Sequence, residues 1–396
     1  MKTVAVCLMC CFGLSGVHAQ DLIRSIGSTR PIPFQDDLAV LEDRMAHRDI
    51  PCTLVAAAPH LDLDLKFHTG YEVSLPLREL AGVSPATLTV VFRVTPEAAA
   101  NGPVFFSQSF KVPPIHGQMD GEVQLGGAFV VGQGRYSVDW LLRDARQRVC
   151  SLHWDLNAKL SGRDREVPLA VGPGVVQPSP AELFENQSRP AAGPLSVKIL
   201  VNFAPQEEDL GILPKREQEA IVAILHTIGR EPRIGHFSVI AFNLRDEQIL
   251  YHQSDTPRID FPGLGRALHA RPPGTIDIRR LAMKDGPAEF LRTLIAGEIG
   301  RSEGMDAVIL AGPKTVSDYD ISPESIRLPV SLPCPMFYLN YNATPDQATS
   351  ADVIGKMVRF LKGRVYAIAH PRDVWLAWRD IMSQLSAGSV LSAAAR

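Results

Sequence analysis

The sequence predicts two folded domains in one chain, an immunoglobulin-like β-sandwich followed by a Rossmann-like α/β domain with a mainly parallel sheet. Three observations lead to this prediction. Short runs rich in β-branched and aromatic residues fill residues 50–163, and strand-like and helix-like segments alternate over residues 194–396. Residues 164–193 between them have the proline and glycine content of a linker. A chain of 396 residues is long enough for this organisation.

Residues 1–19 have the pattern of a secretory signal peptide. Lys2 supplies the positive charge, Val4–Val17 is apolar, and Val17-His18-Ala19 fits a small-residue cleavage site. A mature protein that begins near Gln20 is therefore expected to be secreted or periplasmic. A short membrane anchor is the alternative interpretation of the same residues.

Composition narrows the class of partner. The formal net charge is −3, and aromatic residues make up 7% of the chain. This composition gives neither the basic surface that nucleic acid or an anionic membrane attracts nor many rings for base stacking. We therefore expect a protein partner, with no nucleic acid and no membrane span in the mature chain.

Residues 20–49 are expected to form an N-terminal segment with one short helix near Asp36–His47. Two long strands of the β domain, Tyr136–Arg143 and Val149–Asn157, are expected to flank a turn. Trp140 and Trp154 are then expected in the core. The other strand-like runs are CTLVAAA, LDLDLKFHT, TLTVVFRVT, VFFSQSFKV and GEVQLGGAFVV.

Polar residues on these strands are expected to be structural. Leu61–Phe67 alternates in polarity, so Asp62 and Asp64 are expected on a solvated strand face rather than around a calcium ion. His68 and His153 each lack a second ligand at a fixed spacing, so we expect neither to bind a metal ion.

Three cysteines remain after signal cleavage, Cys52, Cys150 and Cys334. An exported protein can form disulfides. Cys52 and Cys150 lie at the starts of two strand-like runs in the same domain, so they are the best candidate pair, although an unbridged pair is equally consistent with the sequence. Cys334 would be left over. The mature chain has no CxxC pair of the kind that binds zinc.

The second half begins with Leu195–Val201, an apolar run typical of a strand buried on both faces. We expect an amphipathic helix at Lys215–Ile228, then a strand at Phe237–Leu244 with a hairpin partner at Gln248–His252. The later expected elements are helices at Pro287–Ile299, Asp352–Leu361 and Arg372–Leu385, and strands at Ala307–Ala311, Pro335–Tyr341 and Val365–His370. Strands that alternate with helices favour a mainly parallel sheet.

This order resembles a von Willebrand factor type A (vWA) domain, in particular the divergent vWA-related domains of exported bacterial proteins. The matching features are the Val197–Val201 strand, the FSVIAFNL strand with its partner, Gly274-Thr275 before a helix, the DAVILAG strand and the RVYAIAH strand. The resemblance implies a domain that presents binding loops at its strand ends. Typical members bind magnesium or manganese there, in the metal-ion-dependent adhesion site.

The residues of that ion site are replaced in this sequence. The family's first loop carries Asp-x-Ser-x-Ser, whereas this chain has Asn202-Phe-Ala-Pro-Gln206. The third-loop Asp position falls at Ala311 or Gly312, and Thr275 is the one plausible counterpart of a family ligand. Neutral oxygens are a weak ligand set for a hard divalent ion.

The resemblance therefore implies a degenerate adhesion site with no metal ion and no cofactor. Asn202, Gln206 and Thr275 are the expected binding residues. Two alternatives stay open: Asp277 or Asp318 could supply a substitute carboxylate, and Asn202 and Thr275 could serve only to satisfy loop backbone groups.

Other catalytic patterns are weak. The sequence has no Gly-x-Ser-x-Gly elbow, and Gly263-Leu-Gly265 is expected to be a structural turn. His370-Pro-Arg-Asp373 follows a strand, and His252 and Asp255 lie near another. The expected function is an exported, non-enzymatic interaction or adhesion module. The alternative is a periplasmic hydrolase that uses such groups, and a structural envelope component is a third possibility.

Overall fold

The structure is a computed structural model that describes residues 21–23, 35–80, 86–98, 102–114, 121–180, 183–186, 193–206, 213–270, 286–299, 304–314, 316–317, 334–342 and 351–394. The expected signal peptide, Thr275, Asp277 and Asp318 lie outside the described residues. The chain divides into two compact units. The first comprises residues 1–60, 67–159 and 171–181, and the second comprises residues 61–66, 160–170 and 182–396.

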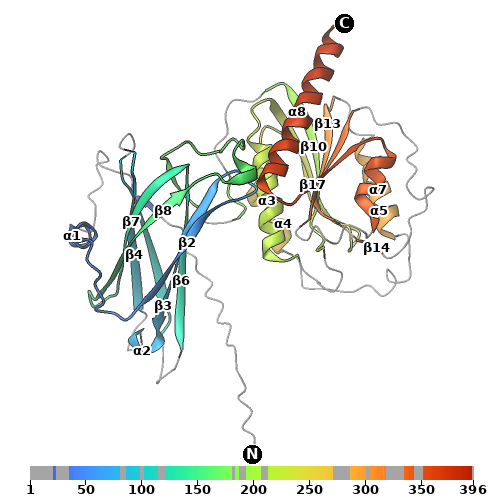
Figure 1. The fold of residues 1–396 in the computed structure, drawn as a ribbon. Coiled ribbons are helices and arrows are strands. Elements are labelled where there is room, and N and C mark those ends of the chain that lie inside the picture. Colours follow the sequence, from blue (N-terminus) through green and yellow to red (C-terminus); the bar gives the residue numbers. More distant parts are fainter. Residues whose placement is uncertain are drawn as a thin grey trace, which may run out of the picture. The chain divides into compact units, whose positions relative to one another are not determined.

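Two antiparallel sheets form the first unit (Figure 1). The five-stranded sheet has the order β1-β5-β4-β7-β8, and the four-stranded sheet has the order β2-β3-β6-β9. The strands are β1 (Asp21–Ile23), β2 (Thr53–Leu61), β3 (Phe67–Pro76), β4 (Ala86–Pro96), β5 (Val104–Val112), β6 (Glu122–Val131), β7 (Gly134–Arg143), β8 (Val149–Ala158) and β9 (Val176–Pro178). Two short helices accompany them, α1 (Gln35–Asp43) and α2 (Leu77–Leu80).

Aromatic rings from both sheets meet in the core of the first unit. Tyr71 of β3 contacts Trp140 of β7 edge-on, with ring centroids 5.4 Å apart. The ring centroids of Phe129 in β6 and Phe92 in β4 lie 5.5 Å apart. Trp140 is fully buried, as the sequence predicts, because it faces inward on β7. Trp154 is only half-buried, so its expected place in the core is wrong.

A disulfide joins Cys52, just before β2, to Cys150 of β8, with a Cα–Cα distance of 6.4 Å. The bridge therefore links the two sheets of the first unit. This confirms the pairing that the sequence favours, and Cys334 is a free cysteine.

A six-stranded mixed sheet forms the centre of the second unit, with the order β12-β11-β10-β13-β15-β17. Neighbours from β11 to β17 pair in parallel, and β12 runs antiparallel to β11. The strands are β10 (Leu195–Asn202), β11 (Ile234–Asn243), β12 (Gln248–Thr256), β13 (Ala307–Pro313), β15 (Met336–Tyr341) and β17 (Arg364–Ile368). A separate antiparallel ribbon pairs β14 (Val316–Ser317) with β16 (Ala351–Asp352).

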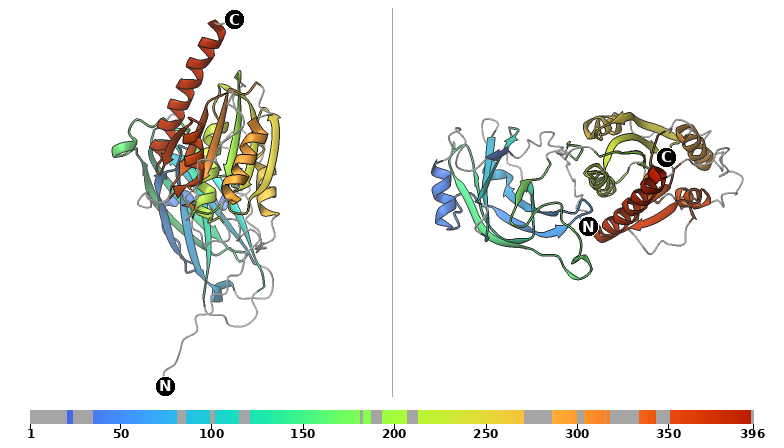
Figure 2. Two further views of the ribbon diagram at one scale, coloured as in Figure 1. Left: turned by 90° about the vertical axis from the view of Figure 1, so that its right-hand side faces the viewer. Right: turned by 90° about the horizontal axis from the view of Figure 1, so that it is seen from above.

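Helices cover both faces of the six-stranded sheet (Figures 1 and 2). One apolar cluster includes residues of α3 (Lys215–Gly229), α4 (Phe261–His269) and α8 (Pro371–Ala394). The other includes residues of α5 (Gly286–Ile299) and α7 (Val353–Phe360). A short 3-10 helix, η1 (Gly162–Asp164), precedes the sheet in the chain.

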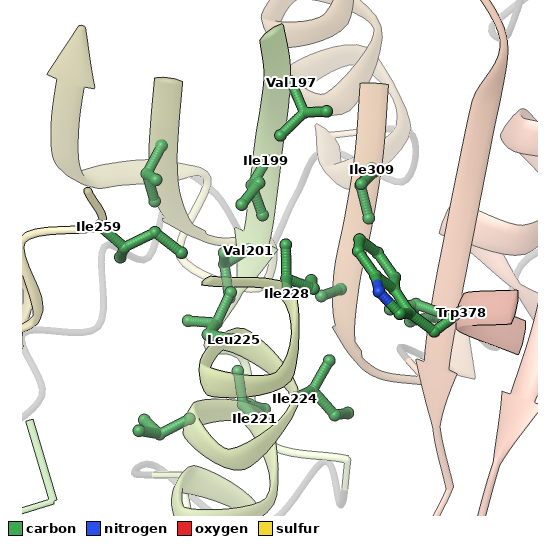
Figure 3. Packing of buried hydrophobic residues seen from close by; sticks show 14 of the residues in the cluster. Val197, Ile199, Val201, Ile221, Ile224, Leu225, Ile228, Ile259, Ile309 and Trp378 are labelled. Atoms are coloured by element: carbon green, nitrogen blue, oxygen red, sulfur yellow. The ribbon is translucent and has the colours of Figure 1, made fainter. Parts of the chain in front are cut away.

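Strand β10 is buried on both faces because it lies between these two clusters. Its residues Val197, Ile199 and Val201 pack on one side with α3, as Figure 3 shows. Leu200 belongs to the opposite cluster. This position explains why the run is apolar at almost every residue. Lys198 is the one charged residue of β10, and its buried ammonium group is bonded to Glu298 of α5.

The predicted fold class is wrong for this chain. The protein is mostly β and 28% helical, its first unit contains antiparallel sheets, and its one sheet with parallel strands is mixed. It is not a clear Rossmann-like parallel α/β fold. The prediction inferred a mainly parallel sheet from the alternation of strands and helices in the second half. Strand direction depends on the pairing of distant segments, and the β11–β12 hairpin places an antiparallel strand at the sheet edge.

Four local predictions are also corrected. The expected strand LDLDLKFHT is interrupted, because β2 ends at Leu61 and β3 begins at Phe67. Asp64 in the intervening turn is 6% exposed rather than solvated. Gly263-Leu-Gly265 is part of helix α4, not a turn, and Asp260 caps that helix by accepting a hydrogen bond from the Gly263 N–H. Part of the expected linker forms β9, which pairs with β6.

Candidate functional site

Asn202 is the last residue of β10, and its side chain fastens the loop that follows. The carboxamide is fully buried. Its Oδ1 atom accepts hydrogen bonds from the backbone N–H groups of Ala204 and Leu244, both at 3.1 Å. Asn202 thus joins the loop after β10 to the end of β11, the role of satisfying loop backbone groups that the sequence left open.

Gln206 joins the same loop to two other elements. Its Nε2 donates a hydrogen bond to Oδ1 of Asn342, just after β15, at 2.9 Å. Its backbone N–H donates to Oε2 of Glu217 in the first turn of α3. Two of the three expected binding residues therefore fasten one loop, the loop after β10, which is held in place by contacts with three other elements. Thr275, the third, lies outside the described residues.

Strand β13 ends very close to β10. Gly312 has a φ of +143°, a backbone conformation that favours glycine. A Cβ atom at this position would lie 2.5 Å from the backbone oxygen of Asn202. The close approach leaves no room for a side chain at this position, so Gly312 serves the packing of the two strands.

Sequence reasoning missed two polar residues near the same strand ends. Asn340 of β15 donates a hydrogen bond from Nδ2 to Oδ2 of Asp352, at 3.0 Å. Asp352 is 8% exposed, and burial raises its pKa. The backbone N–H groups of Gly355 and Ile354 and the charges of Arg359 and Lys314 act in the opposite direction. The signal available in the sequence was the Asn-Tyr-Asn at the end of an apolar strand, but nothing in it pairs Asn340 with Asp352.

The two aspartates suggested for a hydrolase, Asp373 and Asp255, have structural partners. Oδ2 of Asp373 accepts hydrogen bonds from the backbone N–H groups of Ala369 and His370, at the start of α8. Asp255 forms an ion pair with His236 at 3.1 Å, and both side chains are exposed. The Asp373 carboxylate therefore caps the start of α8, which is a structural role.

Asp62 and Asp64 lie in the turn between β2 and β3 rather than on a strand. Oδ1 of Asp64 accepts a hydrogen bond from the Lys66 N–H, and its carboxylate lies 3.8 Å from the Lys66 ammonium group.

Among the described residues, no helix is long and apolar enough to cross a membrane. This finding agrees with the expected absence of a membrane span and does not identify a partner.

Comparisons with known proteins leave the family open. No family model matches the sequence, and no curated protein matches it. A Bordetella pertussis structure named as a candidate ApaA protein is 9% identical and covers 30% of this chain and 99% of its own, with a TM-score of 0.17. A Bacteroides uniformis β-glucuronidase is 9% identical, with a TM-score of 0.19; the alignment covers 78% of this chain and 38% of the enzyme. Scores of this size carry no argument about fold or activity.

Proposed function

We propose that this chain is an exported, non-enzymatic protein-interaction module that binds its partner at the carboxyl ends of β10, β13 and β15. The observation that carries the proposal is the hydrogen bond between Gln206 and Asn342. It ties the loops after β10 and β15 into one platform of neutral amide groups. Rigid loops on a sheet are a common basis for binding, because little conformational entropy is lost when the partner docks.

Two further observations support parts of this proposal. The Cys52–Cys150 disulfide suits the oxidising compartment of an exported protein, in agreement with the signal-like N-terminus. Relationship to the vWA family remains a proposal that rests on the sequence pattern of residues 194–396. In that family the strand ends bind proteins, which is the same place and the same class of ligand.

The hydrolase alternative has less support. Among the described residues, the two aspartates that it would use, Asp373 and Asp255, are engaged in a helix cap and in an exposed ion pair with His236. A catalytic base is normally aligned with a nucleophile and an orienting group. We therefore carry the binding function forward as the main proposal.

The test begins with affinity capture of envelope proteins on the immobilised mature protein, residues 20–396. The partner is then purified and its dissociation constant measured with the wild type, Gln206→Ala and Asn342→Ala. Gln384→Ala is the matched control, because it also removes a glutamine hydrogen bond, from Nε2 to Asp380, but on helix α8. Loss of one platform hydrogen bond is expected to weaken binding about tenfold.

Three results would overturn the proposal. Binding that is equally tight in both platform variants would place the interface elsewhere. Binding that EDTA abolishes and magnesium restores would show an ion-dependent adhesion site. Turnover of ester, peptide or phosphate substrates that His370→Ala abolishes would favour the hydrolase.

A further inference from the structure

The pair formed by Asn340 and Asp352 has an unusual pattern of hydrogen bonds. Nδ2 of Asn340 donates to Oδ2 of Asp352, at 3.0 Å. The one side-chain oxygen of Asn340 and the second carboxylate oxygen of Asp352, Oδ1 in each case, are buried and have no hydrogen-bond partner among the described residues. Two buried acceptors are thus left without a donor on two side chains that already touch. Buried oxygens of this kind are normally satisfied, because leaving them unpaired is costly.

A single proton on Oδ1 of Asp352 would bring both unpaired oxygens into one hydrogen bond. We propose that Asp352 is held as a neutral carboxylic acid in a reciprocal pair with Asn340, and that this pair is a pH-sensitive latch between β15 and the β14–β16 ribbon. The acid O–H at Oδ1 donates to Oδ1 of Asn340, while Nδ2 of Asn340 donates to Oδ2 of Asp352. An ionised Asp352 has no proton to donate, so Oδ1 of Asn340 would remain unpaired.

Some groups around Asp352 favour its ionised form, and its burial favours the neutral form. The backbone N–H groups of Gly355 and Ile354, in the first turn of α7, favour the ionised carboxylate, as do the cations Arg359 of α7 and Lys314 after β13. The hydroxyl of Tyr338 on β15 also faces this region and donates to the backbone oxygen of Pro313. Burial of Asp352 outweighs these groups and favours the neutral acid. The geometry and the electrostatics therefore point the same way.

The position of the Asn340–Asp352 pair explains why protonation of Asp352 would affect the structure. Asp352 belongs to β16 and lies opposite Val316 in the β14–β16 ribbon. Asn340 belongs to β15 and lies between Gly312 of β13 and Ala367 of β17 in the six-stranded sheet. The pair thus joins the ribbon to the sheet near the strand ends. Loss of the proton to solvent as the pH rises removes one of the two hydrogen bonds and weakens the latch, whether or not a partner protein binds nearby.

Asp352→Asn tests the proposal, because an amide at this position donates from Nδ2 where the acid donates from its hydroxyl. The measurement is the midpoint of urea denaturation of the full mature chain, for wild type and variant, from about pH 4 to about pH 9. We expect the wild-type midpoint to fall relative to the variant as the pH rises, because the folded wild type holds a proton that the unfolded chain releases.

Asp380→Asn is the matched control. Asp380 is a carboxylate on α8 that accepts hydrogen bonds from Tyr366 and Arg364, and these bonds lower its pKa. Its variant should therefore lose stability relative to wild type as the pH rises, which is the opposite direction. The proposal is overturned if Asp352→Asn behaves like Asp380→Asn, or if its difference from wild type does not change with pH.

A second measurement covers the case in which Asp352→Asn fails to fold. The wild-type protein is labelled with ¹³C at the aspartate carboxyl groups, and the Asp352 signal is assigned through its backbone connectivity. We expect this signal to remain at the protonated position above the ordinary aspartate range of about pH 4. Titration of Asp352 within that ordinary range would overturn the proposal.

Discussion

The imidazole ring of His226 stacks on the phenyl ring of Phe261, with ring centroids 4.0 Å apart and planes inclined by 21°. His226 lies on the buried face of α3 and is 6% exposed. Burial, followed by the nearby charges of Arg230 and Lys66, lowers its pKa to about 4. The folded protein therefore keeps His226 neutral at pH values where the unfolded chain protonates it.

This difference predicts acid sensitivity. The free energy of unfolding is expected to fall by about 3 kcal/mol as the pH falls from about 6.5 to about 4, because only the unfolded state takes up the proton in that range. Urea denaturation at several pH values measures the change. His226→Leu should remove most of it, whereas His252→Gln, an exposed histidine on β12, should not. A wild type and His226→Leu with parallel pH profiles would contradict the prediction.

Reduction of the Cys52–Cys150 disulfide should destabilise the first unit. The bridge closes a loop with a sequence separation of 98 residues. Its loss is expected to lower the free energy of unfolding by roughly 2–5 kcal/mol, because the unfolded chain gains conformational freedom. Thermal unfolding with and without reductant tests this. The double variant Cys52→Ala/Cys150→Ala lacks the disulfide under both conditions. Cys334→Ala should leave the effect of reductant intact, and an unchanged melting curve after reduction would refute the prediction.

The buried ion pair between Lys198 and Glu298 predicts a strongly non-additive pair of substitutions. Nζ of Lys198 lies 3.0 Å from Oε2 of Glu298 and 2.8 Å from its backbone oxygen. Lys198→Met should cost roughly 3–5 kcal/mol of unfolding free energy, since it leaves a buried carboxylate without its cation. Lys198→Met/Glu298→Leu should recover much of this loss. A double variant as unstable as the sum of the single variants would show that the two charges act independently.

Asn202 should tolerate a carboxylate but not the loss of its acceptor. Asn202→Ala leaves the Ala204 and Leu244 N–H groups without their partner, and it is expected to lower stability by roughly 2–4 kcal/mol. Asn202→Asp keeps an oxygen at the same place and should cost clearly less. Chemical denaturation of the two variants provides the comparison. Equal losses would mean that the Oδ1 contacts do not stabilise the loop.

Much of the local structure could be predicted from the sequence. The expected helix Lys215–Ile228 corresponds to α3, and the expected pair Phe237–Leu244 and Gln248–His252 corresponds to β11 and β12. These elements carry a local signal, since the helix has an apolar face and the strands are bounded by turn residues. The turn that interrupts LDLDLKFHT was missed, because alternating polarity can equally continue through a turn whose leucines are buried.

The candidate site could be predicted only in part. The sequence placed Asn202 and Gln206 in the loop after the central strand, because an apolar run that ends in polar residues marks a strand end. It could not show that Gln206 reaches Asn342 or that Asn340 reaches Asp352. Each contact joins residues that the chain alone does not bring together, and only the packing of β10, β15 and β16 does so.

The sequence by itself determined where the chain forms buried strands and amphipathic helices, because these follow from the spacing of apolar side chains along a short segment. It also favoured the Cys52–Cys150 bridge. Only the tertiary structure decided the sheet order, the mixture of parallel and antiparallel strands, and the burial of Asp64, Lys198 and Asp352. The physical reason is that strand direction and the partner of a buried charge depend on hydrogen bonds between distant segments.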